Sequence, residues 1–133
     1  MSTRYLLDTS AASYAITKKS PVFDRHLIRV PMPELGISTV TEGELRYGLA
    51  RRPSAPLQLT IETFLLGLTI FPWDSSAAQS YGDLRAVLER QGQLLGSLDM
   101  MIAAHALSLQ LTLVSGDVAF KRIKHLKVED WTK

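Results

Sequence analysis

Short apolar runs typical of β-strands alternate along this chain with longer segments of helical periodicity. The predicted strands cover residues 5–8 (YLLD), 36–40 (GISTV), 68–73 (LTIFPW) and 111–115 (LTLVS), and residues 126–131 (LKVEDW) predict an edge strand. This alternation indicates an α/β fold with a mainly parallel sheet and helices on both faces. Because 133 residues suffice for one hydrophobic core, we predict a single α/β domain over residues 1–133, with a small central sheet flanked by helices.

The helices are predicted from apolar periodicity and from residues that can cap a first turn. One helix follows the first strand, another covers residues 22–30, and a third lies around residues 61–68. Thr41, with Glu44 three residues later, forms a capping-box pattern, so a helix is expected to begin there. Ser97 is expected to cap the helix that follows it.

The composition excludes several classes of protein. No apolar run approaches the length of about 18 residues that a membrane span needs. The first ten residues lack the basic and long apolar regions of a secretory signal, so we expect a cytoplasmic protein. The chain has no Cys, which excludes disulfides, thiolate zinc sites and a cysteine nucleophile. A net charge of +2 is too small to indicate nucleic-acid binding by itself.

Four carboxylates fall where predicted strands end and helices begin. Asp8 ends the first strand, Glu44 lies in the first helical turn after the second strand, and Asp117 follows LTLVS by two residues. Asp99 lies at the start of its helix. Because these places share one edge of a parallel sheet, we expect the four side chains to converge there. A single acid at a helix start is most often only a cap, but four at one edge weaken that interpretation.

Carboxylates that converge repel one another, and their pKa values rise unless a cation neutralises them. Oxygen ligands suit Mg²⁺ or Mn²⁺ rather than zinc or copper. His26, His105 and His125 show no metal-ligand spacing, and we interpret His105 as a buried or supporting histidine. A carboxylate-held cation suits hydrolysis of a phosphodiester bond. The chain has no P-loop, G-x-S-x-G or G-x-G-x-x-G motif that would point elsewhere.

At these residues the sequence resembles the PIN-domain ribonucleases, in particular the VapC toxins of bacterial VapBC toxin–antitoxin pairs. The similarity runs through four blocks in order: YLLDTS (5–10), ISTVTEGELRYG (37–48), GSLDMMIAAHAL (96–107) and LTLVSGDVAFKRIKHLKVEDW (111–131). The second block is similar to one whose catalytic Glu stands four residues before a Gly, which selects Glu44 over Glu42. Each block alone is weak, but all four in order at this length are specific.

The resemblance implies a Mg²⁺-dependent endoribonuclease. Asp8 and Asp99 would bind the metal most directly, and Glu44 and Asp117 would complete the metal and water shell. The implied substrate is structured RNA, often tRNA, and in similar relatives the anticodon loop of the initiator tRNA. The implied partners are a second copy of the chain, a cognate VapB antitoxin, and operator DNA contacted through that antitoxin.

The chain departs from the family pattern at three positions. Ser10 stands where the family has an Asn that helps to hold the first acid. The closing block has Ser115-Gly116-Asp117 where Thr-Asn-Asp is common, so Gly116 replaces the Asn. Ala119 stands where the family has an acid before Phe. The last two departures flank Asp117, which is therefore the acid they affect most.

Five basic residues are predicted to contact RNA phosphates, namely Arg46, Arg51, Arg52, Lys121 and Arg122. Two other functions stay open from the residues alone. The first is a Mg²⁺-dependent phosphatase or phosphoacceptor domain, although it usually needs a second Asp near Asp8 and a strand-end Lys, and neither is evident. The second is a non-catalytic regulatory or binding domain whose acids only cap helices, which predicts no effect of Mg²⁺ on the melting temperature.

Overall fold

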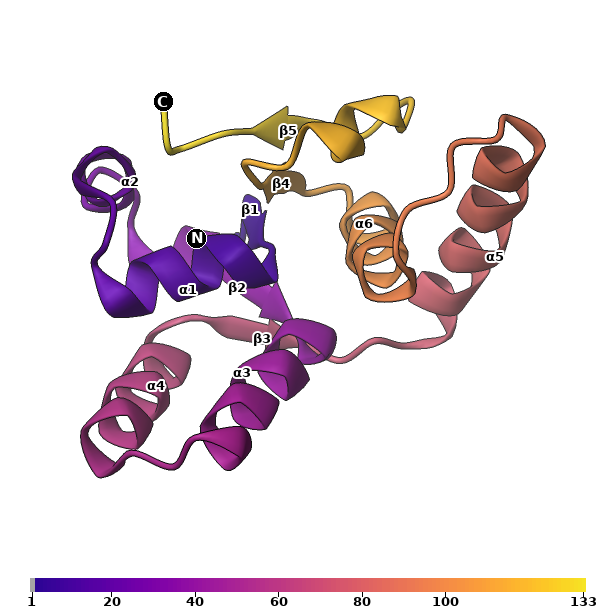
Figure 1. Ribbon diagram of the computed structural model, residues 1–133. Coiled ribbons are helices and arrows are strands. Elements are labelled where there is room, and N and C mark those ends of the chain that lie inside the picture. Colours follow the sequence, from indigo (N-terminus) through magenta and orange to yellow (C-terminus); the bar gives the residue numbers. More distant parts are fainter. Residues whose placement is uncertain (1) are drawn as a thin grey trace.

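The computed structural model describes residues 2–133, and its strands and helices alternate as predicted (Figure 1). The strands are β1 (Tyr5–Leu7), β2 (Leu35–Ser38), β3 (Thr69–Phe71), β4 (Thr112–Val114) and β5 (Val128–Glu129). The helices are α1 (Thr9–Thr17), α2 (Pro21–Leu27), η1 (Met32–Glu34), α3 (Thr39–Arg51), α4 (Ala55–Gly67), α5 (Ser75–Arg90), α6 (Ser97–Leu109) and η2 (Val118–Arg122), where η marks a 3₁₀ helix. None of the described helices combines the length and the hydropathy needed to cross a bilayer.

Within residues 2–133 every strand pair is parallel, and the strand order is β3-β2-β1-β4-β5. This confirms the predicted α/β fold with a small parallel sheet. β1 is central, because Leu6 pairs with Gly36 of β2 on one side and with Leu113 of β4 on the other. The chain builds one half of the sheet outward from β1 and then returns to build the other half. All carboxyl ends therefore share one edge, and the winding direction reverses at β1.

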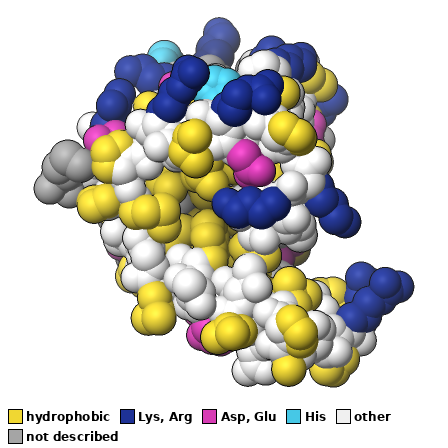
Figure 2. Space-filling view, turned by 90° about the vertical axis from the view of Figure 1, so that its left-hand side faces the viewer, with side chains coloured by type: hydrophobic (Ala, Val, Ile, Leu, Met, Phe, Trp, Pro, Cys, Tyr) yellow, Lys and Arg dark blue, Asp and Glu magenta, His cyan; other side chains and the backbone are white. Residues whose placement is uncertain are grey.

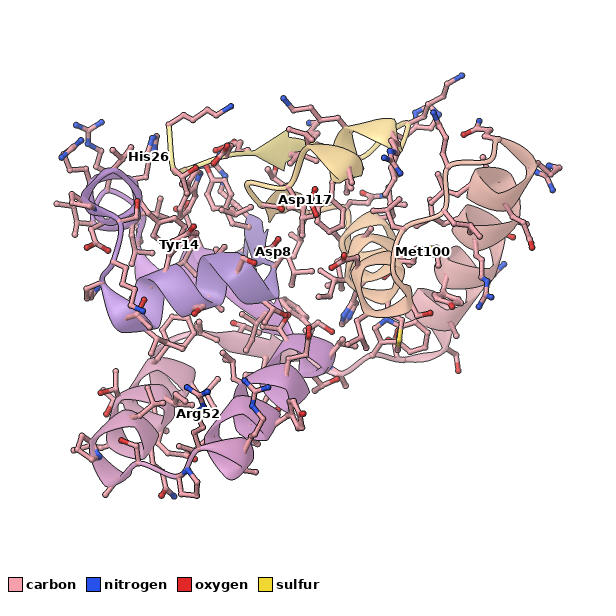
Figure 3. All side chains as sticks on the ribbon, in the orientation of Figure 1. Asp8, Tyr14, His26, Arg52, Met100 and Asp117 are labelled. Carbon is pink, nitrogen blue, oxygen red and sulfur yellow. The ribbon has the colours of Figure 1, made fainter. Side chains whose placement is uncertain are left out.

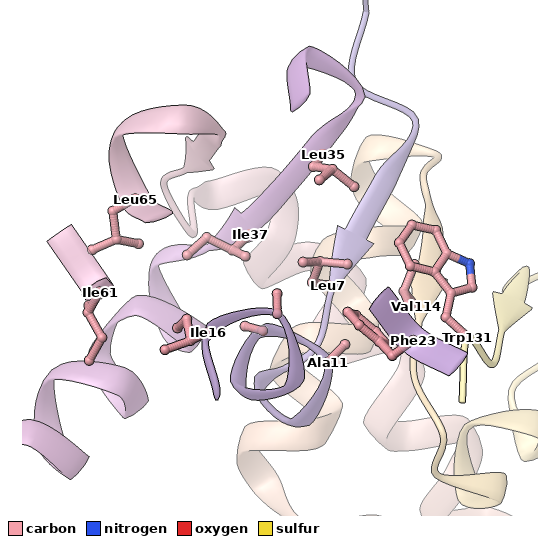
Figure 4. Close-up of a cluster of buried hydrophobic side chains, with 12 residues drawn as sticks. Leu7, Ala11, Ile16, Phe23, Leu35, Ile37, Ile61, Leu65, Val114 and Trp131 are labelled. Atoms are coloured by element: carbon pink, nitrogen blue, oxygen red, sulfur yellow. The ribbon is translucent and has the colours of Figure 1, made fainter. Parts of the chain in front are cut away.

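Two successive residues of β1 enter separate hydrophobic cores on the two faces of the sheet. Leu7 packs with residues of α1, α2 and α4 and with Trp131, whose ring centroid lies 5.7 Å from that of Phe23 (Figure 4). Leu6 packs with residues of α5, α6 and η2. Each fully buried side chain of this size contributes about 1.5–3 kcal/mol. The helices on both faces are thus fixed relative to the same central strand.

Two helices begin at residues other than those predicted. α3 begins directly after Ser38, whose hydroxyl oxygen accepts the Val40 N–H at 3.0 Å, so the expected cap at Thr41 is wrong. Thr41 is instead completely buried within the helix. Gly96 is the N-cap of α6, because its carbonyl already accepts the first helical hydrogen bond at 2.9 Å. The expected cap at Ser97 is therefore also wrong.

Helices α3 and α4 form a projecting pair, in which α3 leaves the carboxyl edge of the sheet and α4 leads back to the start of β3 (Figure 1). Arg46 on α3 joins the two helices, since its guanidinium lies 3.0 Å from Glu42 in the same helix and 2.9 Å from Glu62 on α4. A groove of about 500 Å³ separates α4 from α1 and α2. Its lining is largely apolar, and Figure 2 shows this side of the molecule.

Candidate active site

Asp8 follows β1 directly, at the centre of the carboxyl edge, and is only 5% exposed. Its Oδ1 accepts the Ala11 N–H at 2.7 Å, so Asp8 caps α1. Its backbone N–H donates to the Val114 carbonyl of β4 at 3.1 Å, and the Ser115 hydroxyl donates to its carboxylate. The position of Asp8 is therefore set by α1 and β4 together.

Burial raises the pKa of Asp8 above its ordinary value, and the charges of Asp99 and Asp117 raise it further. The hydrogen bonds from Ser115 and Ala11 act in the opposite direction and favour the ionised form. The net effect is a carboxylate that is costly to keep charged. The contributions of Asp99 and Asp117 place three acids from distant parts of the chain within electrostatic range of one another.

Asp99 lies in the first turn of α6 and is partly buried. Burial raises its pKa, and Asp117 and Glu44 raise it further. The rest of α6 is anchored by side chains in the second core, including Met100 and Ile102 (Figure 3). The apolar body of the helix therefore holds Asp99 at the edge, close to an acid from each side of the sheet.

Glu44 lies in the second turn of α3 rather than the first, because α3 begins earlier than predicted. Its Oε1 accepts a hydrogen bond from the hydroxyl of Thr9, which also lies 3.4 Å from the Thr41 hydroxyl. Thr9 is the residue after Asp8. The start of α1 therefore positions two acids, one through the cap and one through the neighbouring hydroxyl.

Asp117 is exposed and caps η2, since its Oδ1 accepts the Ala119 N–H at 2.9 Å. Its own N–H donates to the Ser115 hydroxyl oxygen at 3.0 Å. Because the Ser115 hydroxyl donates in turn to Asp8, this buried serine links the two acids. Both lie between α1 and α6 in Figure 3.

The four carboxylates influence one another electrostatically but do not form a finished metal site. Within residues 2–133 no group of three or more Asp, Glu or His side chains is close enough to hold a metal ion. The four carboxylates are therefore close enough to affect one another's pKa values, but they are not at the distances of ligands around one metal ion. The donor set fits a hard divalent cation in kind, since burial and mutual repulsion disfavour the ionised oxygens and a cation relieves both costs.

His105 is 1% exposed, which confirms its interpretation as a buried histidine. Its Nδ1 lies 2.8 Å from the Ser38 hydroxyl oxygen, and its ring meets Phe71 edge-on with centroids 6.3 Å apart. Burial lowers the pKa of His105, so the ring is neutral at pH 7. Because Ser38 caps α3, this contact joins the helix that carries Glu44 to the helix that carries Asp99.

Three of the five predicted phosphate contacts lie on the projecting pair of helices. Arg46 is engaged by two glutamates, as described above. Arg51 lies over the Tyr47 ring, 5.7 Å from its centroid, and Arg52 ends α3 at the far tip (Figure 3). Arg51 is seven residues beyond Glu44, which corresponds to about 10 Å along the helix axis. Arg51 and Arg52 are therefore separated from Glu44 along the helix.

The other two predicted contacts, Lys121 and Arg122, end η2 shortly after Asp117. Lys121 shares a hollow of about 120 Å³ with Asp117. Arg122 instead lines a groove of about 450 Å³ against α5. Of the five, Lys121 is the one that the structure places beside an acid of the site.

The family model described as the PIN domain matches residues 5–126. The chain belongs to the PIN-domain family. It is 33% identical over 132 residues to Ribonuclease VapC2 of Rickettsia felis, covering 97% of this chain and 98% of the relative. It is 34% identical over 131 residues to the tRNA(fMet)-specific endonuclease VapC of Shigella flexneri, with 97% and 98% covered.

Solved structures of PIN-domain toxins agree with this assignment. The crystal structure of VapBC2 from Rickettsia felis, bound to a DNA fragment from its promoter, superposes with a TM-score of 0.87 at 32% identity. The superposition covers 96% of this chain and 98% of that one. The resemblance to the VapC members of the PIN-domain family is thereby confirmed.

In this PIN domain, reasoning from the sequence missed three hydroxyl residues that support the acids. Thr9 and Ser115 each lie within two residues of an acid, so their places beside Asp8 and Asp117 offered a signal. Ser38 offered no such signal, because its partner His105 is 67 residues away in the chain.

Proposed function

We propose that this PIN domain is a Mg²⁺-dependent endoribonuclease toxin that hydrolyses RNA phosphodiester bonds in the bacterial cytoplasm. The observation that carries the proposal is the acid set at the carboxyl edge, in which Asp8 and Asp99 have pKa values raised by burial and by the other acids. Such costly charge arrangements concentrate at functional sites. The proposal is supported by relatives named as a ribonuclease and as an endonuclease.

In this proposal each acid has its own support within the chain. Asp8 is oriented by the Ala11 N–H and by Ser115, and Asp99 by the buried body of α6. Thr9 donates to Oε1 of Glu44, which leaves Oε2 to orient a water molecule or a ligand. A divalent cation held by these carboxylates would lower the pKa of water and offset the charge that develops at the phosphate.

We further propose tRNA as the substrate, with the anticodon loop of the initiator tRNA as the site of cleavage. The name of the Shigella flexneri relative, a tRNA(fMet)-specific endonuclease, supports the choice of tRNA. The proposed partners are a second copy of the chain, a cognate VapB antitoxin, and operator DNA contacted through that antitoxin. The Rickettsia felis VapBC2 complex with promoter DNA supports the antitoxin and the DNA as partners. The largely apolar groove between α4 and helices α1 and α2 is a surface of the kind that a protein partner covers.

The test is cleavage of purified tRNA, with and without Mg²⁺, by the wild type and by Asp8→Asn and Asp99→Asn. Asn keeps the shape of Asp and also caps helices, so these changes remove a charge while the fold is retained. Glu89→Gln is the matched control, because Glu89 is exposed on α5 and the change removes one negative charge away from the acids. We expect only the wild type and Glu89→Gln to cut the tRNA when Mg²⁺ is present. Equal cutting by all four proteins would refute the assignment.

A second measurement separates an enzyme from a binding domain whose acids are only caps. Mg²⁺ that binds the native state stabilises it by about 2.7 kcal/mol at one hundred times the dissociation constant. We therefore expect Mg²⁺ to raise the melting temperature of the wild type but not that of Asp8→Asn. No shift in the wild type would favour the cap interpretation.

A further inference from the structure

A basic segment leads away from the acids along the outside of the molecule. Residues 118–128, from η2 to the start of β5, contain no Asp or Glu, and their cationic or imidazole side chains are Lys121, Arg122, Lys124, His125 and Lys127. All five side chains are exposed. The segment begins beside Asp117 at the carboxyl edge. It ends near the start of β4, where the Lys127 carbonyl accepts the Leu113 N–H at 2.8 Å (Figure 1).

Every third residue anchors this segment to the second hydrophobic core. Phe120 and Ile123 are buried in that core, and Leu126 packs against it. Next to Leu126, His125 has a φ of 69°, so the chain makes a left-handed turn there. The basic side chains between these anchors therefore project from a backbone that the core holds in place.

Three hollows border the segment. The first, of about 120 Å³, is lined by Asp117 and Lys121. The next, of about 450 Å³, is lined by Arg122 and Lys124 on one side and by α5 on the other, whose residues there are mostly apolar, such as Leu84, but include the acid Asp83. Charged and apolar surfaces thus face each other within one groove.

The third hollow, of about 630 Å³, lies at the amino edge of the sheet, where Arg4 and Thr112 begin or precede strands. Lys127 lines it together with Arg4, and His125 lines both this hollow and the groove on α5. The basic segment therefore borders a series of hollows from the carboxyl edge to the amino edge.

The cations of the basic segment make no ion pair within the described residues. The ion pairs of residues 2–133 involve only Arg4 and Arg46 as cations. Hydrogen bonds from Thr132 lower the pKa of Asp130, and the charge of Lys121 contributes to that lowering from beyond ion-pair distance. A row of cations without protein partners creates a positive field that attracts an external polyanion.

We infer that the basic segment is a second RNA-binding surface, which holds the sugar–phosphate backbone of the substrate while the four acids act on one bond of it. This inference rests on the proposed ribonuclease function. RNA is favoured over an acidic protein because its backbone carries one negative charge per nucleotide in a row. The basic segment likewise carries its positive charges in a row. The apolar wall of the groove on α5 also gives an unstacked base a surface to contact.

The inference is tested by measuring RNA binding as a function of salt concentration. The protein carries Asp99→Asn so that it does not cut, and the probe is labelled, purified tRNA. Lys124→Ala with Lys127→Ala removes two cations from the segment. Lys19→Ala with Arg29→Ala is the matched control, because it removes the same charge from exposed positions around α2.

We expect the segment variant to bind tRNA more weakly and the control variant to bind as before. The slope of log affinity against log salt should become shallower by about 0.7 for each cation removed. In the cutting enzyme, the loss should fall on KM rather than on kcat. Unchanged affinity and slope in the segment variant would overturn the inference, as would an equal loss in the control.

The proposed function and this inference fail in different experiments. Wild-type protein that does not cut tRNA with Mg²⁺ refutes the function, whereas binding of tRNA through the segment is measured without any cleavage. Retained tRNA binding together with lost binding of an acidic protein partner would overturn the inference and assign the segment to that partner.

Discussion

The contact between Ser38 and His105 should couple the stabilities of two helices. The Ser38 hydroxyl oxygen accepts the Val40 N–H at 3.0 Å and lies 2.8 Å from His105 Nδ1. This hydrogen bond links the cap of α3 to a buried ring nitrogen of α6, whichever of the two groups donates. Ser38→Ala therefore removes a helix cap and leaves that ring nitrogen without its hydrogen-bond partner.

The expected cost follows from these two losses. A lost helix cap costs about 1 kcal/mol. An unsatisfied buried group costs about 1–3 kcal/mol, so Ser38→Ala should lower the free energy of unfolding by about 2–4 kcal/mol. His105→Leu loses the same Ser38 contact. The double variant should then cost less than the sum of the two single variants, by about 0.5–3 kcal/mol.

The assay is urea unfolding at pH 7, followed by tryptophan fluorescence. A slope of about 1–3 kcal/mol per molar urea converts the loss in Ser38→Ala into a midpoint shift on the order of 1 M. Ser54→Ala is the matched control, because Ser54 caps α4 through the Leu57 N–H at 3.3 Å and has no histidine partner. It should cost only about 1 kcal/mol. Strict additivity of Ser38→Ala and His105→Leu would refute the coupling.

Four further predictions concern charge and packing. Burial lowers the pKa of His105 in the native state, so native stability should be lost as the pH falls below the unfolded value of 6.5, and His105→Asn should flatten this loss in urea titrations at several pH values. Burial raises the pKa of Asp8, so the ionised form costs stability as the pH rises above 3.8. Asp8→Asn should therefore stabilise the metal-free protein at pH 7 by about 0.5–2 kcal/mol, measured as a higher melting temperature. Gly36→Ala should cost about 1–3 kcal/mol in urea unfolding, because its Cβ would lie 2.7 Å from a ring carbon of Phe71. Gly82→Ala, in the open interior of α5, should instead gain about 0.5–1 kcal/mol.

The sheet and the placement of the acids were predictable because both follow from local pattern. Apolar β-branched runs and the helices between them are visible in the sequence, and parallel strands bring their carboxyl ends to one edge. Asp8, Asp99 and Asp117 each stand beside such an end or a helix start. The pattern does not contain side-chain rotamers, so it could not give the distances between the four carboxylates.

The helix starts were less predictable because several polar residues near each start are suitable caps. Thr41 and Ser38 are both good capping residues, and the choice depends on the partners that the fold supplies. Thr41 lies buried near Thr9, whereas Ser38 meets His105. Arg46 is similar, since an exposed arginine on a helix suggests phosphate binding until Glu62 approaches from α4. Contacts between distant segments decided these cases.

The reversal of winding at β1 divides the four acids equally between the two halves of the chain. Asp8 and Glu44 precede β3, and Asp99 and Asp117 follow it. A chain still being synthesised therefore holds only Asp8 and Glu44 until residue 99 has been added, and it lacks Asp117 until its last quarter is made. If the protein cuts RNA, this strand order would keep the nascent chain inactive until synthesis is nearly complete. The RNAs needed for its own translation would then stay intact while it is made.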